Sequence, residues 1–234
     1  VPTGNFGNIL AAYYAKKMGL PINKLICASN INKVLTDFIE TGVYDRNRDF
    51  YATCSPSMDI LISSNLERLL YIITGHDDAQ IREWFTSLAE TGRYEVSDAV
   101  KKVLSEEFYG GYCDDEQTKS TIHDIYAKYS YTCDTHTAVA VKVYEDYKNA
   151  TGDTTKTIIA STASPYKFSA SVLEAIEGSN SDLDEYEMVD KIAELSDIPV
   201  PAALAELKDK ERRFKDSIEK SDMTSYVLKE FGLN

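Results

Sequence analysis

Hydrophobic positions recur at helical spacing near the start of the chain. Residues 8–18 carry apolar side chains three and four positions apart, which predicts a helix with one buried face. Gly19 is suited to end this helix, and Pro21 prevents it from continuing. The apolar positions of the face are Ile9, Leu10, Tyr13, Tyr14 and Met18.

The next elements alternate between strand and helix. The short apolar run 25–28 predicts a buried strand, and residues 34–42 predict a second helix that ends at Gly42. A helix, a strand and a helix in this order are typical of a sheet with crossover helices. We therefore expect an α/β fold.

The middle of the chain, about 57–149, is helical in pattern and offers few strand candidates. Asp77 and Gln80 are spaced as in a capping box, and Gly92 ends the helix that follows. Ser97 can cap the next helix. We interpret the block as a helical insertion packed beside the sheet.

Two further helices are expected in this block, after a break. Gly110 and Gly111 are expected to interrupt the chain. Residues 117–129 repeat the helical pattern, and another helix begins at Asp134 or Thr135 and runs to about Tyr147. His136 lies at its start, where a histidine is more often a cap or surface residue than a catalyst.

A strand and a turn are predicted after this block. Residues 157–160 are β-branched and apolar, and Ser164 with Pro165 is a favourable helix start. Thr162 would then lie just past the carboxyl end of a strand, where open α/β sheets bind ligands. From the residues alone, a role in shaping the turn is the favoured interpretation of Thr162. Helices at 185–196, 201–214 and 214–231 complete the expected elements.

The first eight residues offer candidate chemistry. Gly4 and Gly7 flank Asn5 and Phe6, and the first predicted helix follows at Asn8. Free N–H groups and the positive end of the helix dipole at such a start favour an anion, so the loop is a candidate phosphate cradle. A plain turn is the competing interpretation, because a strand is expected before such a loop and the chain begins inside the motif.

Composition excludes several function classes. The chain has 234 residues, 43% of them hydrophobic, which is enough for a sizeable core. Its formal charge is −13, from 38 acidic and 25 basic residues, which argues against binding nucleic acid. It contains no apolar stretch of about 18 residues that could span a membrane. The four cysteines lack zinc-site spacing, so we predict no metal site and free thiols in the cytoplasm.

Three segments resemble the threonine synthase family. They are the loop at residues 2–8, the helix start at 134–139 and the run at 162–168. The resemblance implies part of a fold type II sheet that binds pyridoxal 5'-phosphate (PLP), with a helical insertion and a helical C-terminal extension. It also implies that Gly4, Asn5, Phe6, Gly7 and Asn8 bind the cofactor phosphate. In the same way it implies that Thr162 hydrogen-bonds the pyridine nitrogen.

The chain departs from the family pattern in three places. Thr135 stands where the family has proline, and Ser164 where it has histidine. The lysine that carries PLP as a Schiff base has no match, so no catalytic residue is assigned. We expect a fragment, inactive alone, in which residues 1–172 belong to the PLP domain and 173–234 form the extension. An exposed sheet edge would favour a dimer.

The implied activity of the parent protein is the conversion of O-phospho-L-homoserine and water to L-threonine and phosphate. Three other interpretations stay open: a non-catalytic subdomain with only an anion-binding loop, an acidic helical interaction module, and a dehydratase or cysteine synthase of the same fold. The wording of the loop at residues 4–8 argues against the last of these.

Overall fold

The computed structural model describes residues 1–179, 182–196 and 198–233. The chain divides into two compact units, Val1–Ile198 and Pro199–Asn234. This division falls later in the chain than the boundary expected near residue 172. In the part that the structure describes, no helix is long and apolar enough to cross a membrane.

The first unit is built around a small parallel sheet. β1 (Leu25–Ser29) pairs in parallel with β4 (Phe108–Tyr112), Leu25 lying beside Phe108. On the other edge of β1, Pro2 forms a parallel bridge to Ala28, and the N–H of Thr3 donates to the carbonyl of Ala28 at 2.8 Å. β2 (Val43–Asp45) and β3 (Arg93–Glu95) form a separate antiparallel pair, with Tyr44 opposite Tyr94.

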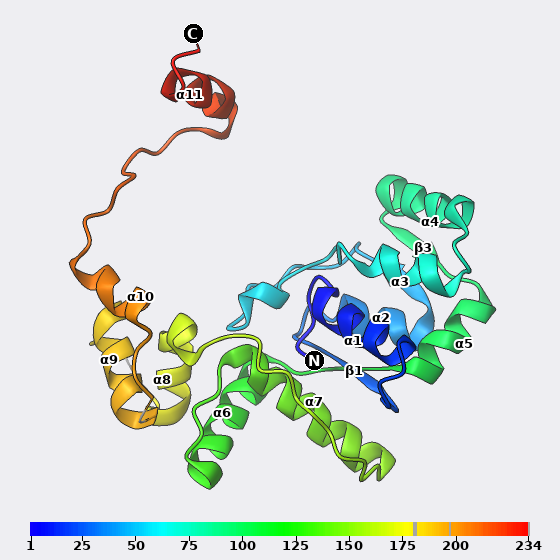
Figure 1. The fold of residues 1–234 in the computed structure, drawn as a ribbon, viewed down its shortest axis with the longest axis horizontal. Helices are drawn as coiled ribbons and strands as arrows, with labels where there is room; N and C mark the ends of the chain where they lie inside the picture. The colour runs from blue at the N-terminus through cyan, green and yellow to red at the C-terminus, as the bar shows by residue number, and fades with distance from the viewer. Residues whose placement is uncertain (180–181, 197, 234) are drawn as a thin grey trace. The chain divides into compact units, whose positions relative to one another are not determined.

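Helices make up most of the first unit (Figure 1). They are α1 (Gly7–Lys17), α2 (Val34–Thr41), α3 (Leu66–Ile73), α4 (Asp78–Thr91), α5 (Asp98–Glu107), α6 (Asp115–Tyr129), α7 (Thr135–Thr151), α8 (Ser169–Glu177) and α9 (Glu185–Ser196). Short 3-10 turns lie at η1 (Pro56–Met58) and η2 (Pro165–Phe168). Asp77, Asp114 and Asp134 cap α4, α6 and α7 with their side chains, as their positions before helical runs favour.

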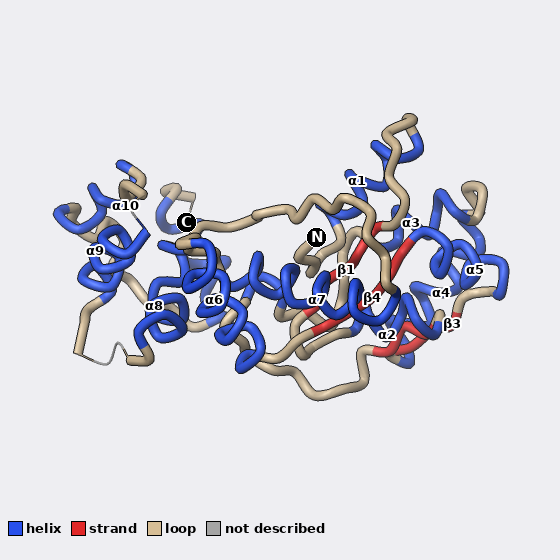
Figure 2. Tube along the Cα trace, turned by 90° about the horizontal axis from the view of Figure 1, so that it is seen from below, coloured by secondary structure: helices blue, strands red, loops and turns tan. Residues whose placement is uncertain are grey.

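The two faces of β1 pack against two different layers of helices. Leu25 and Cys27 belong to the large core formed with α1–α5, whereas Ala28 packs with Val139 and Val143 of α7. This alternation is the period of two that a strand imposes. Figures 1 and 2 show α7 on the opposite side of β1 from α1 and α2. The α/β class, with helices on both faces of a parallel sheet, is confirmed.

Gly110 and Gly111 do not break the chain, contrary to expectation, but lie inside β4. A Cβ on Gly110 would lie 3.0 Å from the Cα of Thr36, and a Cβ on Gly111 would lie 2.5 Å from Cγ1 of Val143. The two glycines therefore let α2 and α7 approach opposite faces of the sheet closely. Glycine inside a strand is a known sign of such an approach.

The strand predicted at 157–160 is wrong. The segment is extended but has no ladder partner among the described residues, and the side chain of Ile158 is 89% exposed. The β-branched composition favours extended backbone, whereas a strand also needs a neighbouring edge to pair with. The placement of Thr162 at the end of a strand is wrong for the same reason.

The second unit has less helix than predicted. The helix α10 (Ala202–Ala205) gives way to a 3-10 turn at Glu206–Asp209, and α11 (Met223–Glu230) begins well after the expected start. Phe214 and Ile218 between them are exposed. Short helices need an apolar face packed against a partner, and these residues have no buried core of their own.

Candidate phosphate-binding site

The loop at residues 4–6 is preceded by a short segment that lies along the edge of β1, which the sequence did not reveal. Val1 and Thr3 hydrogen-bond to Ala28 on β1, so the chain enters the loop from the sheet. It leaves the loop directly into α1, which begins at Gly7. The usual context of a phosphate-binding loop is a strand, a tight loop and a helix, and the single bridge of Pro2 to β1 puts the chain in the place of that strand.

The N-terminus of α1 is not capped. Phe6 is its N-cap residue, in the left-handed region at φ 64°, and it provides no side-chain hydrogen bond. No described residue accepts a hydrogen bond from the backbone N–H groups of Asn5, Phe6, Gly7 or Asn8. Asn5, Gly7 and Asn8 are exposed. The free amides and the positive end of the helix dipole are the donors that an anion requires.

The backbone carbonyl oxygens of the loop, in contrast, all accept hydrogen bonds. The hydroxyl of Ser63 donates to the carbonyl oxygen of Gly4 at 3.0 Å, and the amide of Asn65 donates to the carbonyl of Asn5 at 2.7 Å. The side-chain oxygen of Asn5 accepts from Ser64. With its oxygens tied to residues 63–65, the loop is left with donors rather than acceptors for a ligand.

Phe6 anchors the loop to the core. Its side chain is only 1% exposed, and its ring centroid lies 5.7 Å from that of Phe108 on β4. The side chain is therefore not available to a ligand, and only the backbone N–H of Phe6 could contact one. A phenylalanine in the left-handed region is strained, so the packing of its ring must offset that cost.

Gly4 is required by a close approach rather than by its φ angle. A Cβ at this position would lie 2.6 Å from the carbonyl oxygen of Ser57 and 3.2 Å from the Cα of Met58. Real Cβ atoms do not come so close, so any larger residue would push η1 away from the loop. The turn η1 is thus the wall against which the loop is built.

A buried polar network fixes the segment around η1. The carboxylate of Asp59 accepts from Asn30 at 2.7 Å, from Asn32 at 3.2 Å and from both the N–H and the hydroxyl of Thr53. Asn30 follows the last residue of β1, so the network lies at the carboxyl end of the sheet. Ligands of open α/β sheets bind at this end.

His136 joins the start of α7 to η1. Its Nε2 accepts a hydrogen bond from the backbone N–H of Ser57 at 3.2 Å, and its ring lies 4.7 Å from that of Phe168. Asp134 caps α7 by accepting from the N–H groups of His136 and Thr137. Burial alone would raise the pKa of Asp134, but the hydrogen bonds from His136 and Thr137 outweigh it and hold the pKa below its ordinary value.

Thr162 is not brought to the loop by any hydrogen bond. Its side chain is exposed, and within the described chain it has no hydrogen-bond partner. Its neighbour Ser161 contacts α7, with its hydroxyl 3.3 Å from that of Thr137. The role expected for Thr162 stays a prediction.

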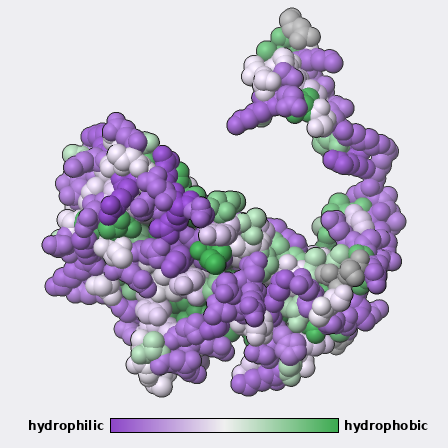
Figure 3. Space-filling view, turned by 180° about the vertical axis from the view of Figure 1, so that it is seen from behind, coloured by the Kyte–Doolittle hydropathy of each residue, from purple (hydrophilic) through white to green (hydrophobic). Residues whose placement is uncertain are grey.

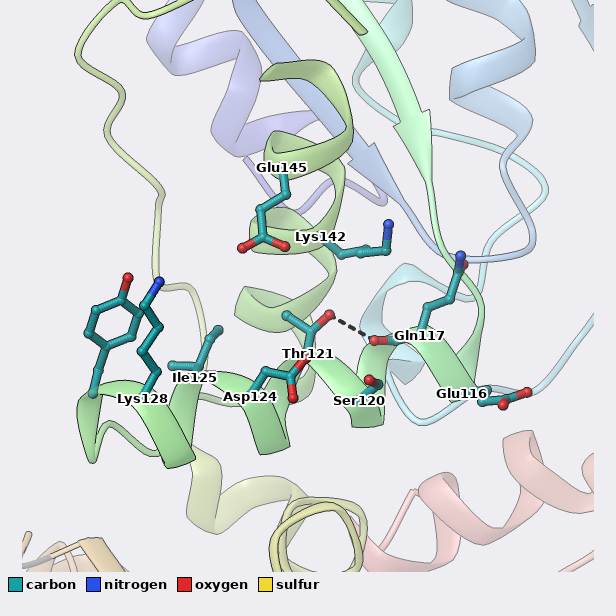
Figure 4. Close-up of a pocket in the computed structure, with 10 residues that line it drawn as sticks. Glu116, Gln117, Ser120, Thr121, Asp124, Ile125, Lys128, Lys142 and Glu145 are labelled. Atoms are coloured by element: carbon teal, nitrogen blue, oxygen red, sulfur yellow. Dashed lines mark hydrogen bonds between the residues drawn. The ribbon is translucent and has the colours of Figure 1, made fainter. Parts of the chain in front are cut away.

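A separate groove of about 330 Å³ lies along α6 and α7. Figure 4 shows its walls, which include Glu116, Asp124, Lys128 and Glu145. The N-terminus of α6 beside it is already capped, because the carboxylate of Asp114 accepts from the N–H of Gln117 at 2.8 Å. An anion would meet carboxylates there rather than free amides. The face of the molecule seen in Figure 3 is mostly hydrophilic.

The braces of the loop carry no local signal in the sequence. Ser63 and Asn65 follow the loop by almost 60 residues, and no repeat or spacing links them to Gly4 or Asn5. Asn30, Asn32 and the run 55–60 likewise carry no local pattern from which a role can be read. Only the contacts in the folded structure show that Ser63 and Asn65 brace the loop.

Comparison with known proteins yields one family. The family model described as threonine synthase, C-terminal, matches residues 137–227. The human protein threonine synthase-like 1 is 44% identical over 178 residues, which cover 76% of this chain and 24% of the relative. Yeast (Saccharomyces cerevisiae) threonine synthase is 38% identical over 226 residues, which cover 90% of this chain and 44% of the relative.

A solved structure agrees with these matches. PLP-bound threonine synthase from Brucella melitensis is 34% identical and superimposes with a TM-score of 0.77, over 97% of this chain and 44% of that one. The chain thus spans less than half the length of each of these relatives. The uncapped N-terminus of α1 and the parallel pairing of β1 with β4 agree with the predicted fold type. The chain belongs to the threonine synthase family.

Proposed function

We propose that this chain supplies the phosphate-binding side of a PLP site in a threonine synthase. The observation that carries the proposal is the loop before α1, whose carbonyls are all held and whose amides are free. Its donors suit a phosphate monoester, which presents several strong acceptor oxygens. The bound PLP in the Brucella relative supports the identity of the ligand.

Each residue of the loop has a limited part in this proposal. The backbone N–H groups of Asn5, Phe6, Gly7 and Asn8 bind and orient the phosphate, while Gly4 allows the close approach of η1. Thr162 would hydrogen-bond the pyridine nitrogen of the cofactor. When bound, PLP supplies an electron sink for proton removal from an amino acid.

The reaction of the whole protein would convert O-phospho-L-homoserine and water to L-threonine and phosphate. None of the lysines of this chain matches the family's cofactor-bearing lysine, so we propose that the chain alone is inactive. Its residues bind and orient, and the proton transfers would need groups outside it. O-phospho-L-homoserine would be the small-molecule partner.

The test compares the natural gene product that contains this sequence with the 234-residue chain itself. Both are incubated with PLP and O-phospho-L-homoserine, and phosphate and threonine are measured. We expect equal amounts of both products from the gene product and neither from the chain alone. A gene product that binds PLP but releases no phosphate would overturn the substrate, and one that binds no PLP would overturn the site.

Two further proposals concern the setting of the protein. We propose a cytoplasmic location, supported by four cysteines that are all unpaired. We also propose a dimer, supported by the short edge that Val1–Thr3 leaves at the side of the sheet. Size-exclusion with light scattering on the 234-residue chain that gives the mass of a monomer would overturn the dimer.

A further inference from the structure

We propose that His136 is a positioning residue that fixes the wall of the phosphate loop through Ser57. The imidazole Nε2 accepts from the N–H of Ser57, and the carbonyl oxygen of the same residue lies 2.6 Å from the place of a Cβ on Gly4. One peptide segment therefore faces the histidine on one side and the loop on the other. The consequence for cofactor binding rests on the function proposed above.

The hydrogen bonds define the protonation of the imidazole. A nitrogen that accepts from a backbone N–H carries no proton, so Nε2 must be the bare nitrogen of the ring. The proton is then on Nδ1, which lies 3.3 Å from the hydroxyl of Thr135 and 3.5 Å from the carboxylate of Asp134. Both groups can accept a hydrogen bond, which favours the proton on Nδ1.

Packing leaves the histidine little freedom. His136 is 3% exposed, and its ring contacts that of Phe168 at the end of η2. Met58, next to Ser57, packs in one cluster with Val139 and Ala140 of α7. The ring is therefore held between η1 and the segment that carries Thr162, so it links the two parts of the chain that the proposed site uses.

The hydrogen bond to His136 is the one that the backbone N–H of Ser57 makes within the described chain. No other described residue accepts from this N–H. If the acceptor is removed, a backbone donor loses its partner in a part-buried position, and η1 can move away from Gly4. The loop would then lose its wall while its other brace, from Ser63, stays in place.

Two substitutions separate this role from simple packing. His136→Gln can place its side-chain oxygen near the position of Nε2 and keep an acceptor for Ser57. His136→Asn is shorter, so it keeps a polar group near Nδ1 but does not reach Ser57. Both remove the ring from Phe168, so the loss of packing is common to the two variants.

The measurement is amide hydrogen exchange in the natural gene product, without added cofactor. We expect peptides covering residues 1–8 and 55–60 to exchange about tenfold faster in His136→Asn than in the unmodified protein. In His136→Gln they should stay within about twofold. Equal exchange in the two variants would overturn the proposal, because packing would then be the whole role of the ring.

A second measurement needs no variant and is independent of folding defects. Nitrogen NMR of histidine-labelled protein at neutral pH should show His136 as the neutral form with its proton on Nδ1. A proton on Nε2 would overturn the proposal. PLP affinity, followed by fluorescence, separates the two levels: failure to bind PLP with the exchange contrast intact overturns the proposed function but leaves the role of His136 standing.

Discussion

The phenol oxygen of Tyr44 accepts a hydrogen bond from the backbone N–H of Ser63 at 2.8 Å. The same hydroxyl donates to the carbonyl of Leu61 at 3.1 Å, so it holds the segment from which Ser63 reaches Gly4. Burial raises the pKa of Tyr44 to about 12, so the hydroxyl stays protonated and can do both. The loop at residues 4–6 is thus braced from inside the core by a side chain on β2.

We predict that Tyr44→Phe destabilises the protein by about 1–3 kcal/mol, because it leaves the N–H of Ser63 without its buried partner. The free energy of unfolding in urea measures the effect. Tyr94 offers a matched control. Its ring stacks on Tyr44 at 5.3 Å, and its hydroxyl is buried with no partner among the described residues. Tyr94→Phe should therefore be neutral or stabilising, and an equal loss in both variants would contradict the bracing role.

Gly4 and Gly7 should respond differently to alanine. Gly4→Ala places a Cβ 2.6 Å from a carbonyl oxygen of η1, and should cost about 1–3 kcal/mol of stability. Gly7→Ala meets only the amide of Asn65, at 3.6 Å, and gains helix propensity at the first position of α1. Thermal unfolding of both variants should show a lower midpoint for the first alone. A lower midpoint for Gly7→Ala would contradict the room for a Cβ that the structure leaves at this position.

The packing of α7 on β4 can be tested by a pair of substitutions. Gly111→Ala drives a Cβ to 2.5 Å from Cγ1 of Val143, and should cost about 1–3 kcal/mol. In the double variant with Val143→Ala the clash disappears, so the two costs should not add. A double-mutant cycle in urea measures the coupling. Simple additivity would mean that β4 does not lie against α7 at this point.

The cap of α7 should lend stability that depends on pH. The pKa of Asp134 is lower in the folded protein than its ordinary value of 3.8, so the folded state prefers the carboxylate. Its contribution is complete above the ordinary pKa and is lost as the pH falls through the folded pKa. Asp134→Ala should cost about 1–2 kcal/mol at neutral pH.

Below pH 3.8 this difference between Asp134→Ala and the unmodified protein should shrink. Unfolding curves at several acidic pH values measure the change. Asp77→Ala is a control for helix capping in general, because Asp77 caps α4 with one hydrogen bond at 3.0 Å on the exposed surface. A pH-independent cost for Asp134→Ala would mean that the charge of the carboxylate has no part in the cap.

The elements that could be predicted are those with local causes. The helix α1 follows from its apolar face and Gly19, the strand β1 from a short apolar run, and the caps of α4 and α7 from an aspartate before each helix. Each signal lies within a few residues of its effect. The candidate loop at 4–8 belongs to the same class, because glycine spacing and the start of a helix are adjacent in the sequence.

The elements that could not be predicted depend on distant partners. Gly110 and Gly111 look like a break, and only the approach of α2 and α7 explains them inside β4. The run 157–160 has the composition of a strand, yet no described edge receives it. For the site, the contacts from Ser63 and His136 to the loop region join residues about 60 and 80 positions apart. The spacing of residues along the chain does not indicate which distant residues will be in contact.

The buried ring of Phe6 has a further consequence for any ligand of the loop. Because the ring is packed against Phe108 and the carbonyls of Gly4 and Asn5 are bonded, the chain entropy of this turn is already lost when the protein folds. If the loop binds a phosphate, as proposed above, its amides already have the arrangement that binding requires, and little reorganisation is left to oppose association. The association rate constant would then depend on diffusion and on the electric field at the N-terminus of α1, rather than on a slow rearrangement of the protein.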